Sequence, residues 1–326
     1  MTAELAKPSN GRRRALIAIA GLGVLVYLAA AVITDADRLE AALLALGWGG
    51  TALVLGASAL NYLLRFGRWS MYIRELGHDV PRGRHLLYYL CGFAFTVSPG
   101  KAGEAVRSLY LREHGVSYPD SIAALFVERV LDLMAIALIA CLIVLKDPSY
   151  WPVLVGALGT TLALVVFIGR PQVARGFDRL GARRSGRIAA ALTGIANLLR
   201  SSKALLTPRL LLSGLVLGVV AWGAEGVGFY WILQGLAIES SIPEATGIYG
   251  VSVLAGGAAF FMPGGIGGME VVMPALLVAQ GVPLATAVIA MLLCRLATLW
   301  FAVVLGLIAA TVLETRAVPA PVSGSV

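Results

Sequence analysis

The stretch SPGKAGEAVRSLYLREHGVSYPDSIAALFVERVLDL covers residues 98–133, and MPGGIGGMEVVMPALLVAQGVPLATAVIAMLLCRL covers residues 262–296. Each stretch opens on a Pro-Gly break, which is followed by a glutamate and later by an arginine inside an apolar run. The same spacing separates Glu104 from Arg129 and Glu270 from Arg295. Matched breaks, acids and bases indicate that the chain contains two copies of one structural unit.

The composition of the whole chain excludes a soluble enzyme. Hydrophobic residues make up 59% of the 326 residues and charged residues only 13%, whereas a soluble domain carries about 25% charged residues. Several runs exceed the roughly 18 apolar residues that indicate a membrane-spanning helix. The chain is therefore predicted to be an all-α integral membrane protein.

The apolar runs divide into about six transmembrane helices and two interrupted stretches. The interrupted stretches, 85–112 and 247–281, contain helix breakers, and each half is short for a span. We predict that both are re-entrant helical hairpins, which enter and leave the membrane on the same side. The six spans are 15–33, 48–64, 120–145, 152–169, 210–235 and 284–313. The predicted hairpin turns are Pro99 and Gly100 in the first hairpin, and Pro263, Gly264 and Gly265 in the second.

The distribution of basic residues orients these elements. The connection 170–209 is rich in arginine and has a single acid, Asp178, so the positive-inside rule places it in the cytoplasm. The basic N-terminus 1–14 is assigned to the same side, as are Arg65, Arg68, Arg74, Arg82 and Arg84. These assignments agree only if both hairpins return to the side that they entered. Both termini are then predicted to lie in the cytoplasm, and the protein in the cytoplasmic (inner) membrane of a bacterium.

With this orientation, two units of opposite topology form one transmembrane domain, 15–313. A span, a hairpin and a span make up each unit, at about 48–145 and 210–313. Inverted repeats with broken helices are typical of secondary transporters, whose sites lie between the repeats. Two points stay open elsewhere in the domain. The first span resembles a signal peptide, although its length favours an uncleaved helix. Within the basic connection, residues 188–206 form either an interfacial amphipathic helix or part of a solvated connector. The tail 314–326 is predicted to be disordered.

Charged residues inside the apolar segments are the candidate site. An ionised group at the centre of a membrane helix costs roughly 2.5–3.5 kcal/mol, so such groups pair with one another or line a polar path. Pairing that only locks each hairpin to the next helix is the alternative to a role in binding. Arginine suits a lipid phosphate because its planar fork binds two oxygens. The candidate substrate-binding residues are Lys101, Glu104, Arg107, Glu128, Arg129, Asp132, Glu225, Glu270 and Arg295.

Other residue types carry no chemistry that we can assign. The three cysteines lie in apolar runs, and the three histidines lack metal-ligand spacing, so no metal or cofactor is expected. No catalytic motif and no nucleic-acid recognition module is visible. The aromatic residues near the ends of the spans are interpreted as interfacial anchors. They are Trp69, Tyr72, Tyr88, Tyr89, Tyr150, Trp151, Tyr230 and Trp231.

Residues 98–133 and 262–296 resemble the membrane domain of lysylphosphatidylglycerol synthases, which also occurs alone in flippase-like membrane proteins. The likeness covers about residues 10–313. In the two-domain synthases this membrane part is associated with moving an aminoacylated lipid between leaflets, and aminoacyl transfer belongs to a separate soluble domain. The resemblance therefore implies lipid handling, and we expect no synthase activity in this chain.

The leading hypothesis is a lipid flippase or transporter that moves an anionic or aminoacylated phospholipid, or a related lipid, between leaflets. One alternative is an integral membrane transferase acting on a lipid or polyprenyl substrate, with acids such as Glu104 or Asp132 as bases. Another is a scaffold for a lipid-modifying enzyme. The expected partners are membrane lipids, with a lipid-modifying enzyme or a second copy of the chain as further candidates, and no nucleic acid.

Overall fold

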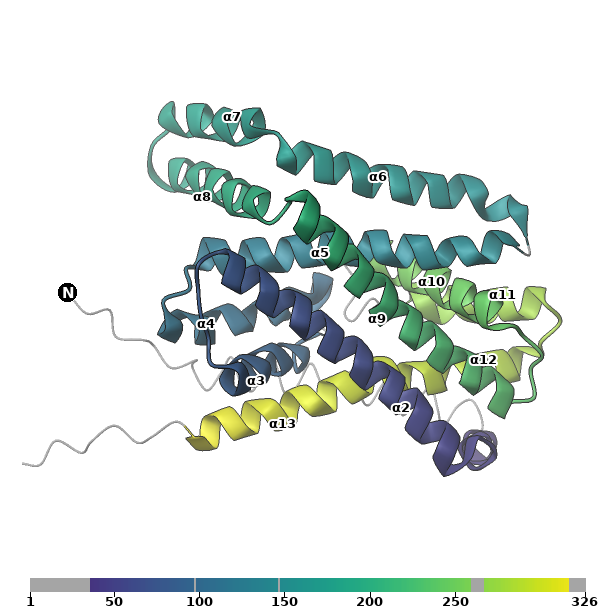
Figure 1. Cartoon of the computed structure of the whole chain (residues 1–326). Helices are drawn as coiled ribbons and strands as arrows, with labels where there is room; N and C mark the ends of the chain where they lie inside the picture. Colours follow the sequence, from purple (N-terminus) through teal and green to yellow (C-terminus); the bar gives the residue numbers. More distant parts are fainter. Residues whose placement is uncertain (1–35, 97, 146, 259–266, 317–326) are drawn as a thin grey trace, which may run out of the picture.

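The computed structural model describes residues 36–96, 98–145, 147–258 and 267–316 (Figure 1). These ranges contain helices and turns and no strand, which confirms the all-α prediction. The predicted N-terminus 1–14, the first span 15–33 and the turn residues Pro263, Gly264 and Gly265 lie outside the described residues. Residues 314–316 of the predicted disordered tail belong to a helix, so that part of the prediction is wrong, and the tail from residue 317 onward lies outside the described residues.

The helices follow one another through short connections. They are α2 (Ala36–Glu75), α3 (Arg82–Phe93), α4 (Arg107–Leu111), α5 (Tyr118–Ala140), α6 (Trp151–Gly169), α7 (Pro171–Ala182), α8 (Gly186–Ala204), α9 (Pro208–Gly235), α10 (Ile242–Ala258), α11 (Gly268–Ala279), α12 (Leu284–Arg295) and α13 (Phe301–Arg316). A 3₁₀ segment, Pro99–Val106, precedes α4, and a π-helical turn, Leu296–Trp300, joins α12 to α13.

Four segments of the described residues are long and apolar enough to cross a membrane. They are Glu40–Glu75, Pro148–Gly169, Pro208–Gly235 and Leu284–Thr315, and each contains one of the predicted spans. Large apolar side chains stay exposed on these helices, such as Trp48 (94%) and Leu212 (66%), as expected for surfaces that face lipid. The predicted span 120–145 corresponds to α5, which does not meet the same criterion because Glu128, Arg129 and Asp132 interrupt its apolar sequence.

Both interrupted stretches fold as helical hairpins. In the first, α3 turns back into the 3₁₀ segment, where the Gly103 N–H donates to Ser98 Oγ (2.7 Å). In the second, α10 packs against α11, and a Cβ on Gly268 would lie only 2.3 Å from the Ala255 carbonyl oxygen. Glycine at that position therefore lets the two arms meet. Their re-entrant placement in a bilayer stays a prediction.

The packing of the two repeats is reciprocal. After its break at Gly47, helix α2 runs antiparallel to α9: Arg68 donates to the Gly214 carbonyl near the start of α9 (3.3 Å), and Ala57 lies against Gly228 in the second half of α9 (Figure 1). The first hairpin packs through α3 on α13, and the second packs through α10 on α5. Each hairpin thus contacts the last helix of the other repeat, as a two-fold relation between inverted repeats requires.

The basic connection 170–209 is not a loop. It forms the antiparallel pair α7–α8, and α8 packs on α5 through buried Ala196 and Leu199. Ser201 Oγ also donates to Asp120 Oδ1 at the start of α5 (2.8 Å). Of the two interpretations of residues 188–206, the helix is confirmed by α8, whose small and apolar side chains on one face hold it to the bundle. Its position in the membrane interface stays a prediction. The basic residues of the connection are exposed: Arg170, Arg175, Arg179, Arg183, Arg184, Arg187, Arg200, Lys203 and Arg209.

We expect Gly306→Ala to destabilise the protein, because a Cβ there would lie 2.2 Å from the Ala94 backbone nitrogen of the first hairpin. The helices must move apart, which costs about 1–3 kcal/mol. The melting temperature of the purified protein measures this loss. Gly156→Ala in α6 is the control, since nothing lies within 4 Å of its Cβ position and alanine is the better helix former. Equal melting temperatures for the two variants would show that the contact between α3 and α13 is not tight.

Candidate functional site

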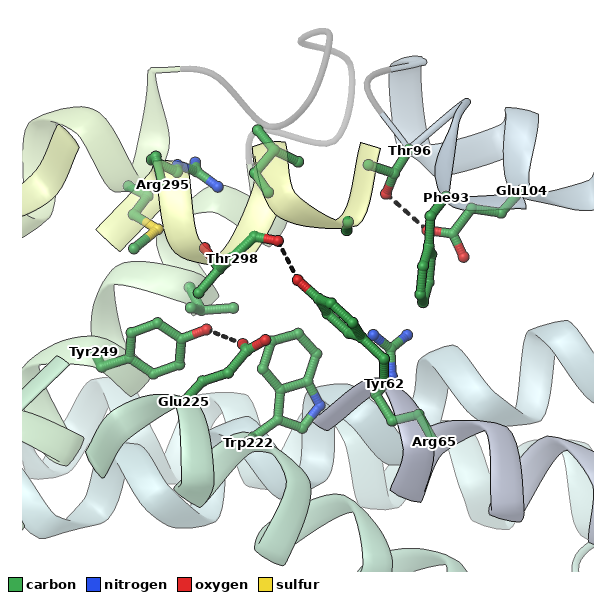
Figure 2. A pocket seen from close by; sticks show the side chains of 14 residues that line it. Tyr62, Arg65, Phe93, Thr96, Glu104, Trp222, Glu225, Tyr249, Arg295 and Thr298 are labelled. Carbon is green, nitrogen blue, oxygen red and sulfur yellow. Dashed lines mark hydrogen bonds between the residues drawn. The ribbon is translucent and has the colours of Figure 1, made fainter. Parts of the chain in front are cut away.

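A pocket lined by both polar and apolar side chains lies between the two repeats (Figure 2). It opens to the surroundings, and α2, α9, both hairpins and the helix from α12 to α13 all contribute to its wall. Three predicted site residues line it: Glu104, Glu225 and Arg295. Tyr62 and Arg65 of α2 line it as well, together with Trp222 of α9 and Tyr249 of α10.

A buried ionic cluster lies beside the pocket on the side of the first repeat, and α5 supplies its centre. Glu128, Arg129 and Asp132 are close together on α5 because residues three and four apart share a helix face. The Arg129 guanidinium lies 3.2 Å from the Glu128 carboxylate and 3.6 Å from the Asp132 carboxylate. Burial is almost complete for Glu128 (0% exposed) and Asp132 (3%). Unpaired charges at such depth would be costly, so the cluster depends on its partners.

The first hairpin adds Glu104 and Arg107 to this cluster. Arg107 Nη2 lies 3.0 Å from Glu128 Oε2 and 3.5 Å from Glu104 Oε2. Glu104 is also 3.4 Å from the Arg129 guanidinium, which is the pair that equal spacing in the sequence suggested. Thr96 Oγ1 donates to Glu104 Oε1 (2.8 Å) and fixes its orientation. The hairpin and α5 are thereby tied together by several ion pairs.

Helix α2 contributes Arg65 and Arg68, which sequence reasoning placed on the cytoplasmic side near the end of a span. Both arginines lie inside the bundle, at 5% and 0% exposed, and both contact Asp132; their cytoplasmic side stays a prediction. The helix continues to Glu75, past the predicted end at residue 64, because acids on α5 neutralise these arginines. Positive-inside counting cannot see such pairing. By contrast, Arg74, Arg82 and Arg84 are exposed.

The charges of the seven ionisable side chains in the cluster do not sum to zero. Arg65, Arg68, Arg107 and Arg129 face Glu104, Glu128 and Asp132, which leaves an excess of one positive charge. Within the described part of the chain, N–H groups of all four arginines lack a hydrogen-bond partner. Arg65 also lines the pocket. This end of the pocket is therefore suited to an anion, since arginine donors bind phosphate or carboxylate oxygens strongly.

Several aromatic residues predicted to be interfacial anchors support this cluster instead. Trp69 and Tyr89 are buried, and the Arg107 guanidinium lies 4.0 Å and 4.9 Å from their ring centres. Such cation–π contacts help to stabilise a buried guanidinium. Tyr72 and Tyr88 are also buried, so the anchor prediction is wrong for all four. It failed because proximity to a span end does not reveal which face of the helix points inward.

The second repeat forms the opposite wall. Arg295 Nε donates to Glu270 Oε1 (2.8 Å), which is the second pair of equal spacing, and Glu270 Oε2 accepts from the Gly267 N–H (2.9 Å). Glu225 accepts a hydrogen bond from the Tyr249 hydroxyl. This wall therefore exposes one base and one acid, Arg295 and Glu225, to the pocket.

The π-helical turn after Arg295 links the two repeats. A π turn loosens the regular hydrogen-bond ladder of a helix and is frequent at functional sites. Here the Thr298 carbonyl accepts a hydrogen bond from the Tyr62 hydroxyl of α2 (Figure 2). No sequence signal indicated this turn. For the aromatic wall residues a signal existed. Tyr62 lies three residues before Arg65 on α2, and Trp222 lies three residues before Glu225 on α9, so helical periodicity would have placed each aromatic residue on the same face as the charged one.

The remaining predicted residues lie around these walls. Pro99, Gly100 and Lys101 are in the 3₁₀ segment of the first hairpin, and the Lys101 side chain is outside what the structure describes. Glu104, Arg107, Glu128, Arg129 and Asp132 come together in the cluster, while Glu225, Glu270 and Arg295 come from the second repeat. Among the described residues, no group of three or more His, Cys, Asp or Glu side chains is arranged to hold a metal ion.

Comparison with known proteins identifies this architecture. The family described as the lysylphosphatidylglycerol synthase TM region has a model that matches residues 16–306. The chain belongs to this family. This lysylphosphatidylglycerol synthase TM-region protein is therefore a multi-pass membrane protein, in agreement with its apolar helices.

A distant relative of this TM-region protein is the glycosyltransferase AglD of Haloferax volcanii. The two are 34% identical over 134 residues, which cover 38% of this chain and 20% of the relative. The chain thus spans about a fifth of the relative's length. Together, the family and this relative suggest a membrane lipid-related protein.

Proposed function

We propose that this protein moves a lipid between membrane leaflets by passing its headgroup through the pocket between the two repeats. The observation that carries the proposal is the pocket itself, which lies between spans and receives charged side chains from both repeats. Transporters built from inverted repeats bind their substrates in such a position. The lipid tails would stay in the bilayer while the headgroup follows the polar wall.

The charges of the pocket support an anionic or aminoacylated headgroup. Arg65, beside the positive cluster, and Arg295 on the opposite wall both favour a phosphate. Glu225 lies beside Trp222 and Tyr249 and supplies a negative charge for an ammonium group (Figure 2). A lipid that carries both a phosphate and an amine would satisfy both kinds of charge.

The exposed arginines of α7 and α8 support a cytoplasmic position for that end of the molecule, by the positive-inside rule. The same rule places both termini in the cytoplasm and the protein in the cytoplasmic membrane. Accessibility of single cysteines in α7 to a reagent that cannot cross membranes tests this orientation in intact cells. Labelling of the Ala182→Cys variant in intact cells, without permeabilisation, would contradict this orientation.

Leaflet exchange in proteoliposomes tests the proposed function. We expect the wild-type protein to equilibrate a fluorescent phosphatidylglycerol or polyprenyl phosphate faster than empty vesicles. Arg295→Ala should slow this exchange about tenfold or more, because an arginine contact with an anion contributes roughly 1.5–3 kcal/mol. Arg200→Ala is the control, since Arg200 is exposed and pairs with Asp178 outside the pocket. Exchange at the wild-type rate by folded Arg295→Ala would exclude that residue from the path.

A second candidate function is transfer of a group to a lipid carrier. It is favoured by the name of the relative, a glycosyltransferase, although the match covers a fifth of that protein. Acids at the pocket, such as Glu104 or Glu225, would then serve as a base. Incubation with a polyprenyl phosphate and nucleotide sugars, followed by mass spectrometry of the lipids, separates the two functions. A new glycolipid would favour the transferase function. Leaflet exchange without any new lipid product would favour the transporter function.

A role in an assembly is compatible with either function. A lipid-modifying enzyme that hands its product to this protein, or a second copy of the chain, would be its partner. Cross-linking in native membranes followed by purification identifies such a partner, and a monomer with no stoichiometric companion would exclude both.

A further inference from the structure

The two Glu–Arg pairs of equal spacing are not equivalent in the structure. In the first repeat, Arg129 is within 3.6 Å of three carboxylates, those of Glu104, Glu128 and Asp132. In the second repeat, the salt bridges of Arg295 within the described residues involve Glu270 alone. An arginine shared among three acids in a buried site is firmly held, whereas one that contacts a single acid can change partner at lower cost.

Arg295 is also the better placed of the two for contact with a ligand. It lines the pocket, whereas Arg129 does not (Figure 2). Its Nε is used by Glu270, but its Nη2 is buried without a hydrogen-bond partner among the described residues. Arg295 is 8% exposed, so no protein acceptor replaces the hydrogen bond to water that this N–H group has lost. An anion that reaches this buried donor would supply the missing hydrogen-bond acceptor and lower its free energy.

Glu270 is able to lose Arg295 without losing its place. Its second oxygen accepts from the Gly267 N–H (2.9 Å) at the start of α11, where an acid is favourable. Release of Arg295 would therefore leave the end of α11 capped. It would remove the ion pair between α11 of the second hairpin and α12, which also pack together in the apolar core.

We propose that Arg295 exchanges its partner: Glu270 holds the guanidinium while the pocket is empty, and the phosphate of a lipid headgroup takes it when the pocket is filled. Glu270 thus acts as an internal competitor of the substrate. Binding removes this ion pair and so loosens the contact between the second hairpin and α12, while the ionic cluster keeps the first hairpin fixed. The proposal rests on the proposed function only in that a headgroup phosphate enters the pocket.

Equilibrium binding of radiolabelled short-chain phosphatidylglycerol to the purified protein tests the exchange without transport. We expect Glu270→Gln to bind about three- to tenfold more tightly than wild type, because the competing charge is removed while the amide oxygen can still accept from Gly267. Arg295→Gln should weaken binding about tenfold or more. Asp178→Asn is the control, and we expect no tightening, since Asp178 pairs with exposed Arg200 outside the pocket. Weaker or unchanged binding by folded Glu270→Gln would overturn the proposal.

Hydrogen exchange of the wild-type protein tests the same idea independently of any variant that fails to fold. Saturation with short-chain phosphatidylglycerol should speed amide exchange in α11 and leave α4 unchanged. Protection of α11 would overturn the proposal. The two hypotheses also fail separately. If Glu270→Gln binds more tightly but the wild-type protein does not move lipid between leaflets, the change of partner by Arg295 is retained and transport is rejected. If the protein moves lipid but Glu270→Gln does not bind more tightly, transport is retained and the change of partner is rejected.

Discussion

Asp132→Ala should lower the free energy of unfolding by about 3–5 kcal/mol, the cost of breaking a buried ion pair by removal of one partner. Asp132 contacts Arg65 and Arg68, and it also accepts a hydrogen bond from Trp222 Nε1 (3.1 Å). Without it, two almost fully buried guanidinium groups keep Glu128 as their neighbouring acid, and the positive excess of the cluster rises. Thermal unfolding of the purified protein in detergent measures the loss.

Asp178→Ala is the control for this prediction. Asp178 pairs with Arg200, but both side chains are largely accessible, at 35% and 51% exposed. Exposed ion pairs contribute about 0–1 kcal/mol, so this change should leave the melting temperature almost unaltered. If Asp132→Ala melts at the same temperature as Asp178→Ala, the cluster does not carry the charge balance that we assign to it.

Val253→Trp should reduce leaflet exchange about tenfold or more while the protein stays folded. Val253 lines the pocket from α10, and an indole there would occupy space that a headgroup needs, since packed interiors do not yield easily. The change leaves every charged residue in place, so it tests the path separately from the electrostatics. Fluorescent phosphatidylglycerol in proteoliposomes gives the rate.

Val155→Trp supplies the matched substitution on α6. Its side chain is 45% exposed on a helix that is predicted to face lipid, where an indole is tolerated. We expect exchange at the wild-type rate. Equal rates for folded Val253→Trp and Val155→Trp would mean that lipid does not pass through this pocket.

The repeat was accessible from sequence because its signals are local. Pro-Gly breaks, an acid and an arginine at equal spacing survive in both copies, and the structure forms both the Glu104–Arg129 and the Glu270–Arg295 pairs. Long apolar runs likewise predicted the four described segments that are able to span a membrane. Each of these features depends on residues close together in the chain.

The missed features depend on contacts between distant segments. Arg65 and Arg68 resemble interfacial residues until α5 places Asp132 beside them. Trp69 and Tyr89 resemble anchors until Arg107 of the first hairpin stacks on their rings. Burial of these groups is favourable only in the assembled bundle, so no window of sequence can reveal it.

The central claim is that a lipid crosses the membrane through the pocket between the repeats, and leaflet exchange tests it most directly. Vesicles with the wild-type protein, with Arg295→Ala and without protein would be compared after addition of a reagent that bleaches only outer-leaflet fluorescent phosphatidylglycerol. The account predicts rapid loss of the protected inner-leaflet signal with wild type, and slow loss in the other two preparations. Loss with wild type that is no faster than in empty vesicles, for phosphatidylglycerol and for a polyprenyl phosphate alike, would contradict it.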